Sequence, residues 1–122
     1  APTIPGPRFA GRSGLGNRAD TLLELDDSIG QILDALDRLK LADNTLVIFS
    51  SDNGAYVTDE KGHRPNGPLR GTKSQLWEGG LRVPFIVRWP ARVAPGVSSD
   101  LVSTLDIPAT ALAAAGVTPP AD

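Results

Sequence analysis

A short apolar run that stops at an acid, an amide and a glycine is the feature that most constrains the fold of this chain. Residues 44–56 read NTLVIFSSDNGAY. Four consecutive apolar residues are typical of a strand that is buried on both faces. The predicted strand runs from about Thr45 to Ser50, so Asp52 and Asn53 lie just beyond its carboxyl end. In open α/β sheets, ligands bind beyond the carboxyl ends of strands.

An amphipathic helix is predicted before this strand. Asp20 is expected to be its N-cap, and apolar side chains then recur at steps of three and four up to about Lys40. Residues 1–19 are rich in proline, glycine and arginine, which predicts an irregular lead-in. The apolar stripe consists of Leu22, Leu25, Ile29, Ile32, Leu36 and Leu39.

A second buried strand is predicted at residues 83–89, after a long polar loop over residues 52–80. A last helix is predicted with Asp106 as its cap, Pro108 in its first turn and Gly116 as its stop. The order helix, strand, loop, strand and helix is typical of an α/β layered fold. Its strands are expected to be mostly parallel and buried, with helices on their flanks.

The chain has 122 residues, enough for one domain. Two or three strands cannot cover both faces and both edges of a buried sheet, so residues 1–122 are expected to be a single partial domain. The remainder of the sheet would come from missing parts of the fold or from an oligomer partner. The chain starts with alanine and has no methionine, which favours a fragment or a processed piece.

Composition excludes several classes of function. The net charge of −2 and the lack of a basic stripe argue against nucleic-acid and membrane partners. There is no cysteine, so this sequence contains no disulfide, no thiolate metal ligand and no cysteine nucleophile.

Asp52 and Asn53 offer hard oxygen atoms, which calcium and magnesium prefer. Gly54 would let the backbone turn away sharply. The alternative is an ordinary turn, because Asn-Gly is a common turn pair. A calcium ion takes about 6–8 oxygen ligands, so this pair would form only part of a metal site.

The segment GHRPNGPLRGTKSQLWEGGLRVP places several cations among glycines. Such a loop suits an anionic substrate, because arginine offers a fork of donors and lysine a point charge. The alternative is a solvated basic loop. His63, the single histidine, is open to three roles: general acid, ligand or surface residue. The cations are His63, Arg64, Arg70, Lys73 and Arg82.

These segments together resemble the sulfatases of the arylsulfatase type, within the alkaline-phosphatase-like superfamily. The resemblance covers about residues 8–117, in the order of the family. Its most specific part is the string GPLRG-x-K-x-x-x-W-EGG-x-R-VP. It is joined by FAGRSGLG, LLELDDSIGQILDALDRLKLADNTLVIFSSDNG and STLDIPATALAAAG.

The resemblance implies hydrolysis of sulfate monoesters of aryl compounds or carbohydrates. Asp52 and Asn53 match calcium ligands of the family, with magnesium as the alternative ion. Lys73 matches the lysine that contacts the sulfate group, and Arg70 is a second candidate for substrate binding. His63 matches a substrate-facing histidine of some members. Supporting roles are implied for Trp77, Glu78 and Arg82.

Two departures from the family pattern shape the alternatives. Sulfatases use a formylglycine made from the first residue of a C/S-x-P-S-R motif, which does not occur in this sequence. The lead-in APTIPGPRF also lacks the histidine that relatives carry there. We therefore expect the chain to be inactive alone. The alternatives are a non-catalytic sulfatase remnant and a related phosphoester or phosphonate hydrolase.

Family members are often secreted, periplasmic or lysosomal, and this sequence favours none of these compartments.

Overall fold

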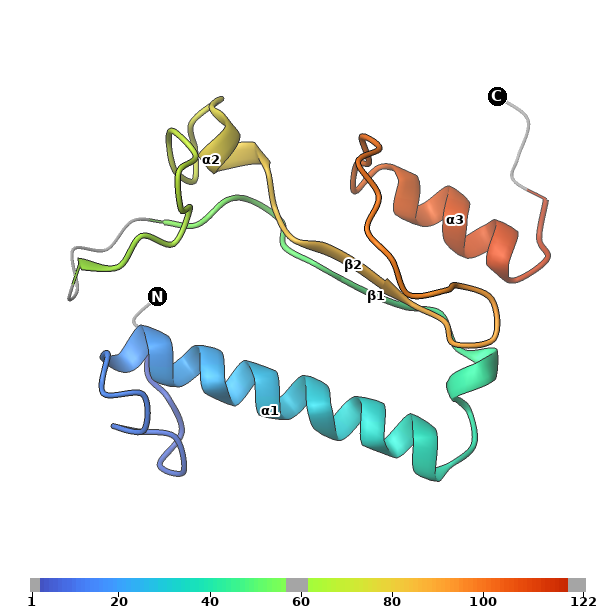
Figure 1. Ribbon diagram of the computed structural model, residues 1–122, viewed down its shortest axis with the longest axis horizontal. Helices are drawn as coiled ribbons and strands as arrows, with labels where there is room; N and C mark the ends of the chain where they lie inside the picture. The colour runs from blue at the N-terminus through green and yellow to red at the C-terminus, as the bar shows by residue number, and fades with distance from the viewer. Residues whose placement is uncertain (1–2, 57–61, 119–122) are drawn as a thin grey trace.

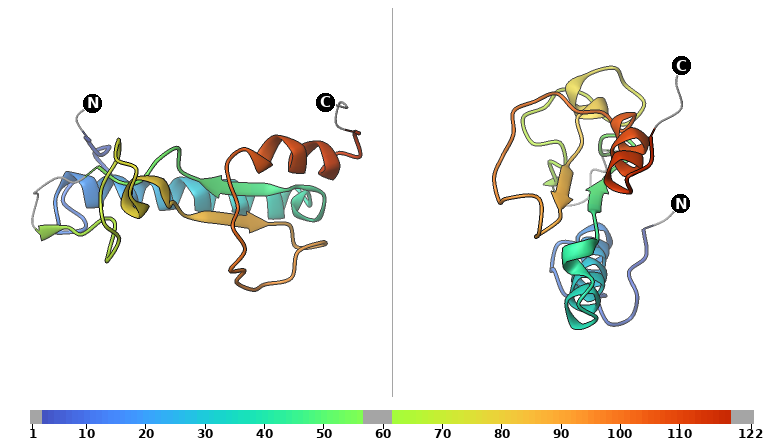
Figure 2. Two further views of the ribbon diagram at one scale, coloured as in Figure 1. Left: turned by 90° about the horizontal axis from the view of Figure 1, so that it is seen from above. Right: turned by 90° about the vertical axis from the view of Figure 1, so that its right-hand side faces the viewer.

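The computed structural model describes residues 3–56 and 62–118. Figure 1 shows a long helix on one side of a pair of strands and a shorter helix on the other, and the end-on view in Figure 2 shows the same order. This is a layered α/β arrangement, as predicted. The elements are α1 Asn17–Arg38, η1 Ala42–Asn44, β1 Val47–Ser50, α2 Glu78–Leu81, β2 Phe85–Arg88 and α3 Asp106–Ala114.

Helix α1 begins at Asn17, so the prediction of Asp20 as its N-cap was wrong. Asp20 lies in the first turn and its side chain is buried. The carboxylate accepts hydrogen bonds from Gly11 N at 2.7 Å, from Ser13 N at 2.7 Å and from Ser13 Oγ at 2.6 Å. The acid therefore joins the lead-in to the helix, where the helix dipole also favours a negative charge.

The other end of α1 is closed by a left-handed residue. Lys40 has φ of 58°, and its N–H donates to Asp37 O at 3.0 Å. Leu41 N donates to Leu36 O at 2.8 Å, which completes the two-bond helix stop known as the Schellman motif. Helix α3 ends in the same way at Gly116, as predicted. Its predicted cap was wrong by one residue, because Leu105 precedes the first helical residue and Asp106 accepts from Ser103 N at 2.7 Å.

The two strands pair antiparallel, with Val47 opposite Arg88 and Ser50 opposite Phe85. The prediction of parallel strands was therefore wrong for this pair. Parallel neighbours need a crossover connection that carries the chain back along the sheet. Between the strands, the described residues 51–56 and 62–84 contain the four-residue helix α2, and β2 runs back along β1 from its carboxyl end.

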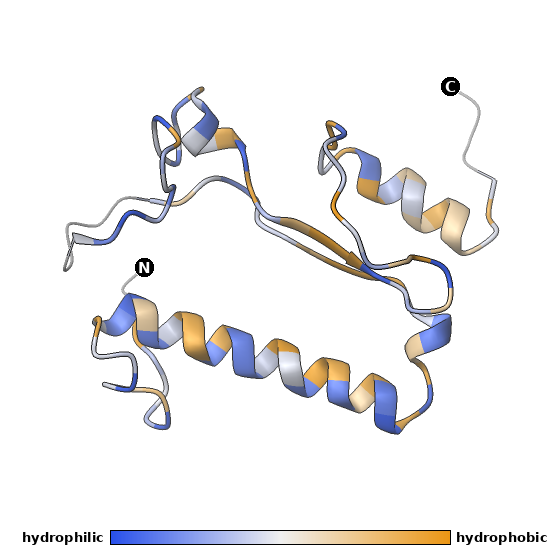
Figure 3. Ribbon diagram, viewed as in Figure 1, coloured by the Kyte–Doolittle hydropathy of each residue, from blue (hydrophilic) through white to orange (hydrophobic). Residues whose placement is uncertain are grey.

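The prediction that both strands are buried was also wrong. The side chains of β1 are half-buried, and in β2 Ile86 is 57% exposed. Figure 3 shows hydrophobic residues along both strands and along α1. Among the described residues, Phe9 is the only hydrophobic side chain that is buried. The sheet is small, so it offers α1 and α3 too little surface on which to bury their apolar side chains.

An apolar cavity of about 400 Å³ lies between helix α1 and the strands and is open to solvent. Its walls include Leu25, Ile29, Phe49 and Ile86. No helix in the part of the chain that the structure describes is long and apolar enough to cross a membrane.

Polar contacts hold the strand pair against α1 at the end where β1 begins and β2 ends. Arg88 Nη2 lies 3.2 Å from Asp37 Oδ1, and Trp89 Nε1 donates to Asp43 O at 2.8 Å. They link β2 to the end of α1 and to η1, so the strand pair has a fixed position relative to α1 at that end.

Candidate functional site

The candidate site begins where β1 ends. Ser51 Oγ donates to Asn53 O at 2.9 Å, and the Asn53 amide nitrogen donates to Asp52 Oδ1. Asn53 is half-buried and Asp52 is exposed. The predicted acid and amide are thus in direct contact, and the adjoining loop holds them at the carboxyl end of the strand.

Gly54 is required here for close packing rather than for a turn. Its N–H donates to Gly80 O at 2.8 Å, and a Cβ at this position would lie 1.9 Å from Gly79 O. Its φ is not positive, unlike that of several other glycines in the chain. Gly54 therefore allows two backbones to touch, a role that the sequence analysis did not predict.

The same kind of packing continues through the glycine-rich loop. Gly79 N donates to Arg70 O at 2.7 Å, and a Cβ on Gly79 would lie 2.2 Å from Gly71 O. Trp77 packs beside Gly71, where a Cβ would lie 2.6 Å from the Trp77 Cβ. The glycines of the segment PLRGTKSQLWEGG therefore form a compact backbone layer against residues 53–55.

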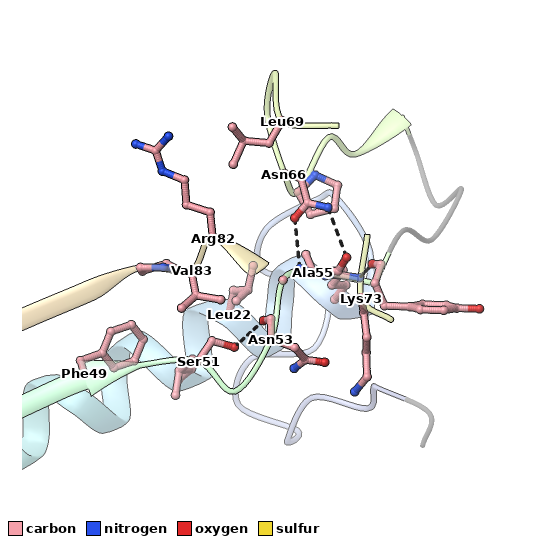
Figure 4. Close-up of a pocket in the computed structure, with 16 residues that line it drawn as sticks. Leu22, Phe49, Ser51, Asn53, Ala55, Asn66, Leu69, Lys73, Arg82 and Val83 are labelled. Atoms are coloured by element: carbon pink, nitrogen blue, oxygen red, sulfur yellow. Dashed lines mark hydrogen bonds between the residues drawn. The ribbon is translucent and has the colours of Figure 1, made fainter. Parts of the chain in front are cut away.

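Asn66 connects this layer to the end of β1, and the sequence reasoning missed it. Its Oδ1 accepts from Ala55 N at 3.1 Å. Its Nδ2 donates to Gly71 O at 2.9 Å and to Ala55 O at 3.3 Å. Figure 4 shows the two contacts with Ala55. The only sequence signal was its place before Gly67, which by itself indicates a turn.

Lys73 is fixed through its backbone rather than through its ammonium group. Its N–H donates to Ala55 O at 3.1 Å. Within residues 3–56 and 62–118, the Lys73 ammonium has no hydrogen-bond or ion-pair partner. Ser74 has φ of 72° and Gln75 N donates to Thr72 O at 3.0 Å, so Lys73 projects from a tight turn.

Asn53 and Lys73 line the same open cavity of about 720 Å³. In Figure 4 their side chains point to the same side of the loop. Asp52, His63 and Arg70 do not line this cavity, and Asp52 is linked to it through Asn53. The remaining walls include Arg18, Tyr56, Asn66, Leu69, Arg82 and Pro84.

Three of the predicted cations, Arg70, His63 and Arg82, make contacts within the protein. The Arg70 guanidinium lies 3.6 Å above the centre of the Trp77 ring. His63 Nε2 lies 2.9 Å from Leu15 O, which ties the loop to the lead-in. Arg82 Nη1 lies 3.5 Å from Glu78 Oε2, one turn away on α2.

Asp52 and Asn53 fit a hard cation chemically but offer few ligands. Among the described residues, no group of three or more His, Asp or Glu side chains is close enough to hold a metal ion. The carboxylate and the amide carbonyl are oxygen donors of the type that calcium and magnesium bind. Their donor set therefore fits part of such a site.

Comparison with known proteins identifies the family. A family model described as Sulfatase matches residues 5–117. The chain therefore belongs to the sulfatase family. It is 50% identical over 115 residues to an N-acetylgalactosamine-6-O-sulfatase of Bacteroides thetaiotaomicron, an alignment that covers 87% of this chain and 22% of that protein. It is 46% identical over 125 residues to the human N-acetylgalactosamine-6-sulfatase, covering 100% of this chain and 24% of that protein.

Solved structures agree with this assignment. A structure from work on the metabolism of multiple glycosaminoglycans by Bacteroides thetaiotaomicron superposes with a TM-score of 0.91 at 46% identity. That match covers 100% of this chain and 27% of the other. A sulfatase of Pseudoalteromonas sp. superposes with a TM-score of 0.83 at 34% identity, covering 93% of this chain and 23% of the other. The chain thus spans about a quarter of the length of the relatives it matches.

Proposed function

We propose that this chain is the later portion of a sulfatase catalytic domain, and that the complete enzyme hydrolyses sulfate monoesters of carbohydrates or aryl compounds. One observation carries the proposal for the site. Asn53 and Lys73 line one cavity, and the Lys73 N–H bonds to Ala55, two residues after Asn53. The family's implied metal ligand and its implied sulfate contact are thus neighbours.

In this proposal Asp52 and Asn53 supply oxygen ligands to a calcium ion, with magnesium as the alternative. When bound, a divalent ion stabilises the negative charge that develops on the transferring sulfuryl group. Calcium takes about 6–8 oxygens, so ligands from outside this chain complete the shell.

Lys73 binds the sulfate group through its ammonium, which has no partner in the part of the chain that the structure describes. Arg70 and His63 are the second candidates for contacts with the substrate. The stacking of Arg70 on Trp77 supports a role in shaping the loop, and the contact of His63 with Leu15 supports a role in positioning the same loop. No nucleophile motif lies in this sequence, so the chain alone is expected to be inactive.

Binding measurements on the 122-residue chain test the proposal. Calorimetry with CaCl₂ is expected to show weak binding, which Asp52→Ala abolishes and Asp34→Ala, at an exposed helical position, retains. Phenyl sulfate is expected to bind, and Lys73→Gln to weaken it. Hydrolysis of a chromogenic aryl sulfate above the blank would contradict the claim that the chain is inactive alone. Tighter binding of phenyl phosphate or phenylphosphonate than of phenyl sulfate would favour the phosphoester or phosphonate alternative.

A non-catalytic remnant is the second candidate. It is favoured by the lead-in APTIPGPRF, which lacks the histidine that relatives carry there. A folded chain that binds neither calcium nor phenyl sulfate would support the remnant and contradict the site assigned to Asp52, Asn53 and Lys73.

A further inference from the structure

The cavity of about 720 Å³ carries more positive charge than Lys73 alone. Arg18 from the first turn of α1 and Arg82 from the residue after α2 also line it. In the part of the chain that the structure describes, the lining includes no aspartate or glutamate. The chain as a whole has a net charge of −2, so the positive lining is a local property of this cavity.

Arg18 is held against the same piece of loop as Lys73. Arg18 Nη1 donates to Tyr56 O at 2.6 Å. The preceding carbonyl, that of Ala55, accepts the Lys73 N–H at 3.1 Å. The carbonyl groups of two consecutive residues, Ala55 and Tyr56, therefore bind the Lys73 backbone and the Arg18 guanidinium. The Cα atoms of consecutive residues are about 3.8 Å apart.

Among the described residues, Tyr56 is the one hydrogen-bond partner of the Arg18 guanidinium, so most of its donors are available there. A guanidinium has five N–H donors in a planar fork, and this contact uses one of them. Arg18 is itself half-buried, so its position is restricted. A carboxylate or a sulfate in the cavity could accept two parallel hydrogen bonds from such a group.

Arg82 is less suited to act together with Lys73. Glu78 already offsets part of its charge, and its side chain is 70% exposed. In Figure 4 the Arg82 guanidinium and the Lys73 ammonium lie at opposite ends of the group of residues. Arg18 is therefore the cation of the cavity best placed to bind a ligand together with Lys73.

We propose that Arg18 recognises a second anionic group, a carboxylate or a second sulfate, on the same substrate whose sulfate ester contacts Lys73. The inference rests on the proposed function, because it takes Lys73 as the contact of the first sulfate. Arg18 is then a specificity residue that selects doubly charged substrates over singly charged ones.

Three probes test this inference by calorimetry at constant ionic strength: phenyl sulfate, 4-carboxyphenyl sulfate and 1,4-phenylene bis-sulfate. The doubly charged probes are expected to bind about tenfold more tightly than phenyl sulfate, as one charge-assisted contact allows. Comparison of the two distinguishes a carboxylate from a second sulfate. Arg18→Gln should weaken the doubly charged probes more than phenyl sulfate and so remove this preference, whereas Lys73→Gln should weaken all three.

Arg12→Gln is the matched control, since Arg12 is exposed in the lead-in and does not line the cavity. Arg18→Lys, which keeps the charge but not the fork, should retain only part of the preference and serves if Arg18→Gln does not fold. Equal affinities for all three probes in the unmodified chain would overturn this inference and leave the proposed function standing. Failure of phenyl sulfate to bind would overturn both. An equal loss of affinity for all three probes in Arg18→Gln would contradict the role in specificity and would indicate a structural role for Arg18 instead.

Discussion

The backbone N–H of Gly54 donates to the carbonyl oxygen of Gly80 at 2.8 Å. This bond joins the residue that follows the candidate metal ligands to the end of the glycine-rich loop. It forms because neither glycine carries a side chain, which lets the two segments approach to hydrogen-bond distance.

Gly54→Ala is expected to destabilise the chain strongly, since the added Cβ would lie 1.9 Å from Gly79 O, a backbone atom that cannot move alone. A loss of about 1–3 kcal/mol in the free energy of unfolding is expected for such overpacking, measured by urea denaturation. Gly96→Ala is the control, because a Cβ at Gly96 meets nothing within 4 Å. Equal stability of the two variants would contradict the packing described for Gly54.

Asn66→Ala removes the amide that bridges Ala55 and Gly71. Three hydrogen bonds are lost, and the Ala55 N–H loses its partner, whereas Ala55 O keeps its bond from Lys73 N. A destabilisation of about 1–3 kcal/mol is expected from unsatisfied part-buried groups. Amide hydrogen exchange at Ala55 should also become faster. Asn44→Ala, at an exposed position in η1, should change neither measurement; a similar effect in both variants would contradict a specific role for Asn66.

Asp20→Ala is expected to detach the lead-in from α1. The variant leaves two backbone N–H groups and the Ser13 hydroxyl without the carboxylate that they bind. Hydrogen bonds to a charged group contribute about 1.5–3 kcal/mol each, so the loss should be easily measured by thermal unfolding. Asp34→Ala on the exposed side of α1 should have little effect. A stable Asp20→Ala chain with slow exchange at Gly11 N would refute this role.

Much of this fold could be predicted from local patterns. The apolar stripe of α1 and the glycine stop of α3 depend on neighbouring residues, so the sequence predicted both helices. The start of α1 was missed because the partners of Asp20 lie outside the helix, at Gly11 and Ser13. The strand direction was missed because an apolar run has the same pattern in parallel and antiparallel pairs, and the path of residues 51–84 decides between them.

The candidate site, like the fold, could be predicted from the sequence only in part. Asp52, Asn53 and Lys73 were chosen from their residue types and motif, and their roles stay predictions. The bridging role of Asn66 and the position of Arg18 depend on carbonyl groups far away in the sequence, at residues 55 and 56. No local pattern carries that information, and a three-dimensional structure was needed to find it.

Lys40→Gly is expected to stabilise the chain. Lys40 adopts φ of 58°, a conformation that costs an L-residue with a Cβ roughly 1 kcal/mol relative to glycine. The gain should be about 0.5–1 kcal/mol in the free energy of unfolding, because glycine also has more freedom in the unfolded chain. Arg38→Gly, two residues earlier and inside the helix, should instead destabilise it. A loss of stability in both variants would contradict the helix stop described for α1.

The antiparallel pairing of β1 with β2 has a consequence for the order of folding. Ser50 and Phe85 meet only after the whole of residues 51–84 has closed into a loop. The entropy of loop closure is lost before any contact of the strand pair forms, and such non-local pairing slows folding. The bonds of Gly54 and Lys73 close smaller loops, so we expect them to shorten that search if they form first. Variants that loosen the candidate site should therefore form the sheet more slowly, even where no strand residue has been changed.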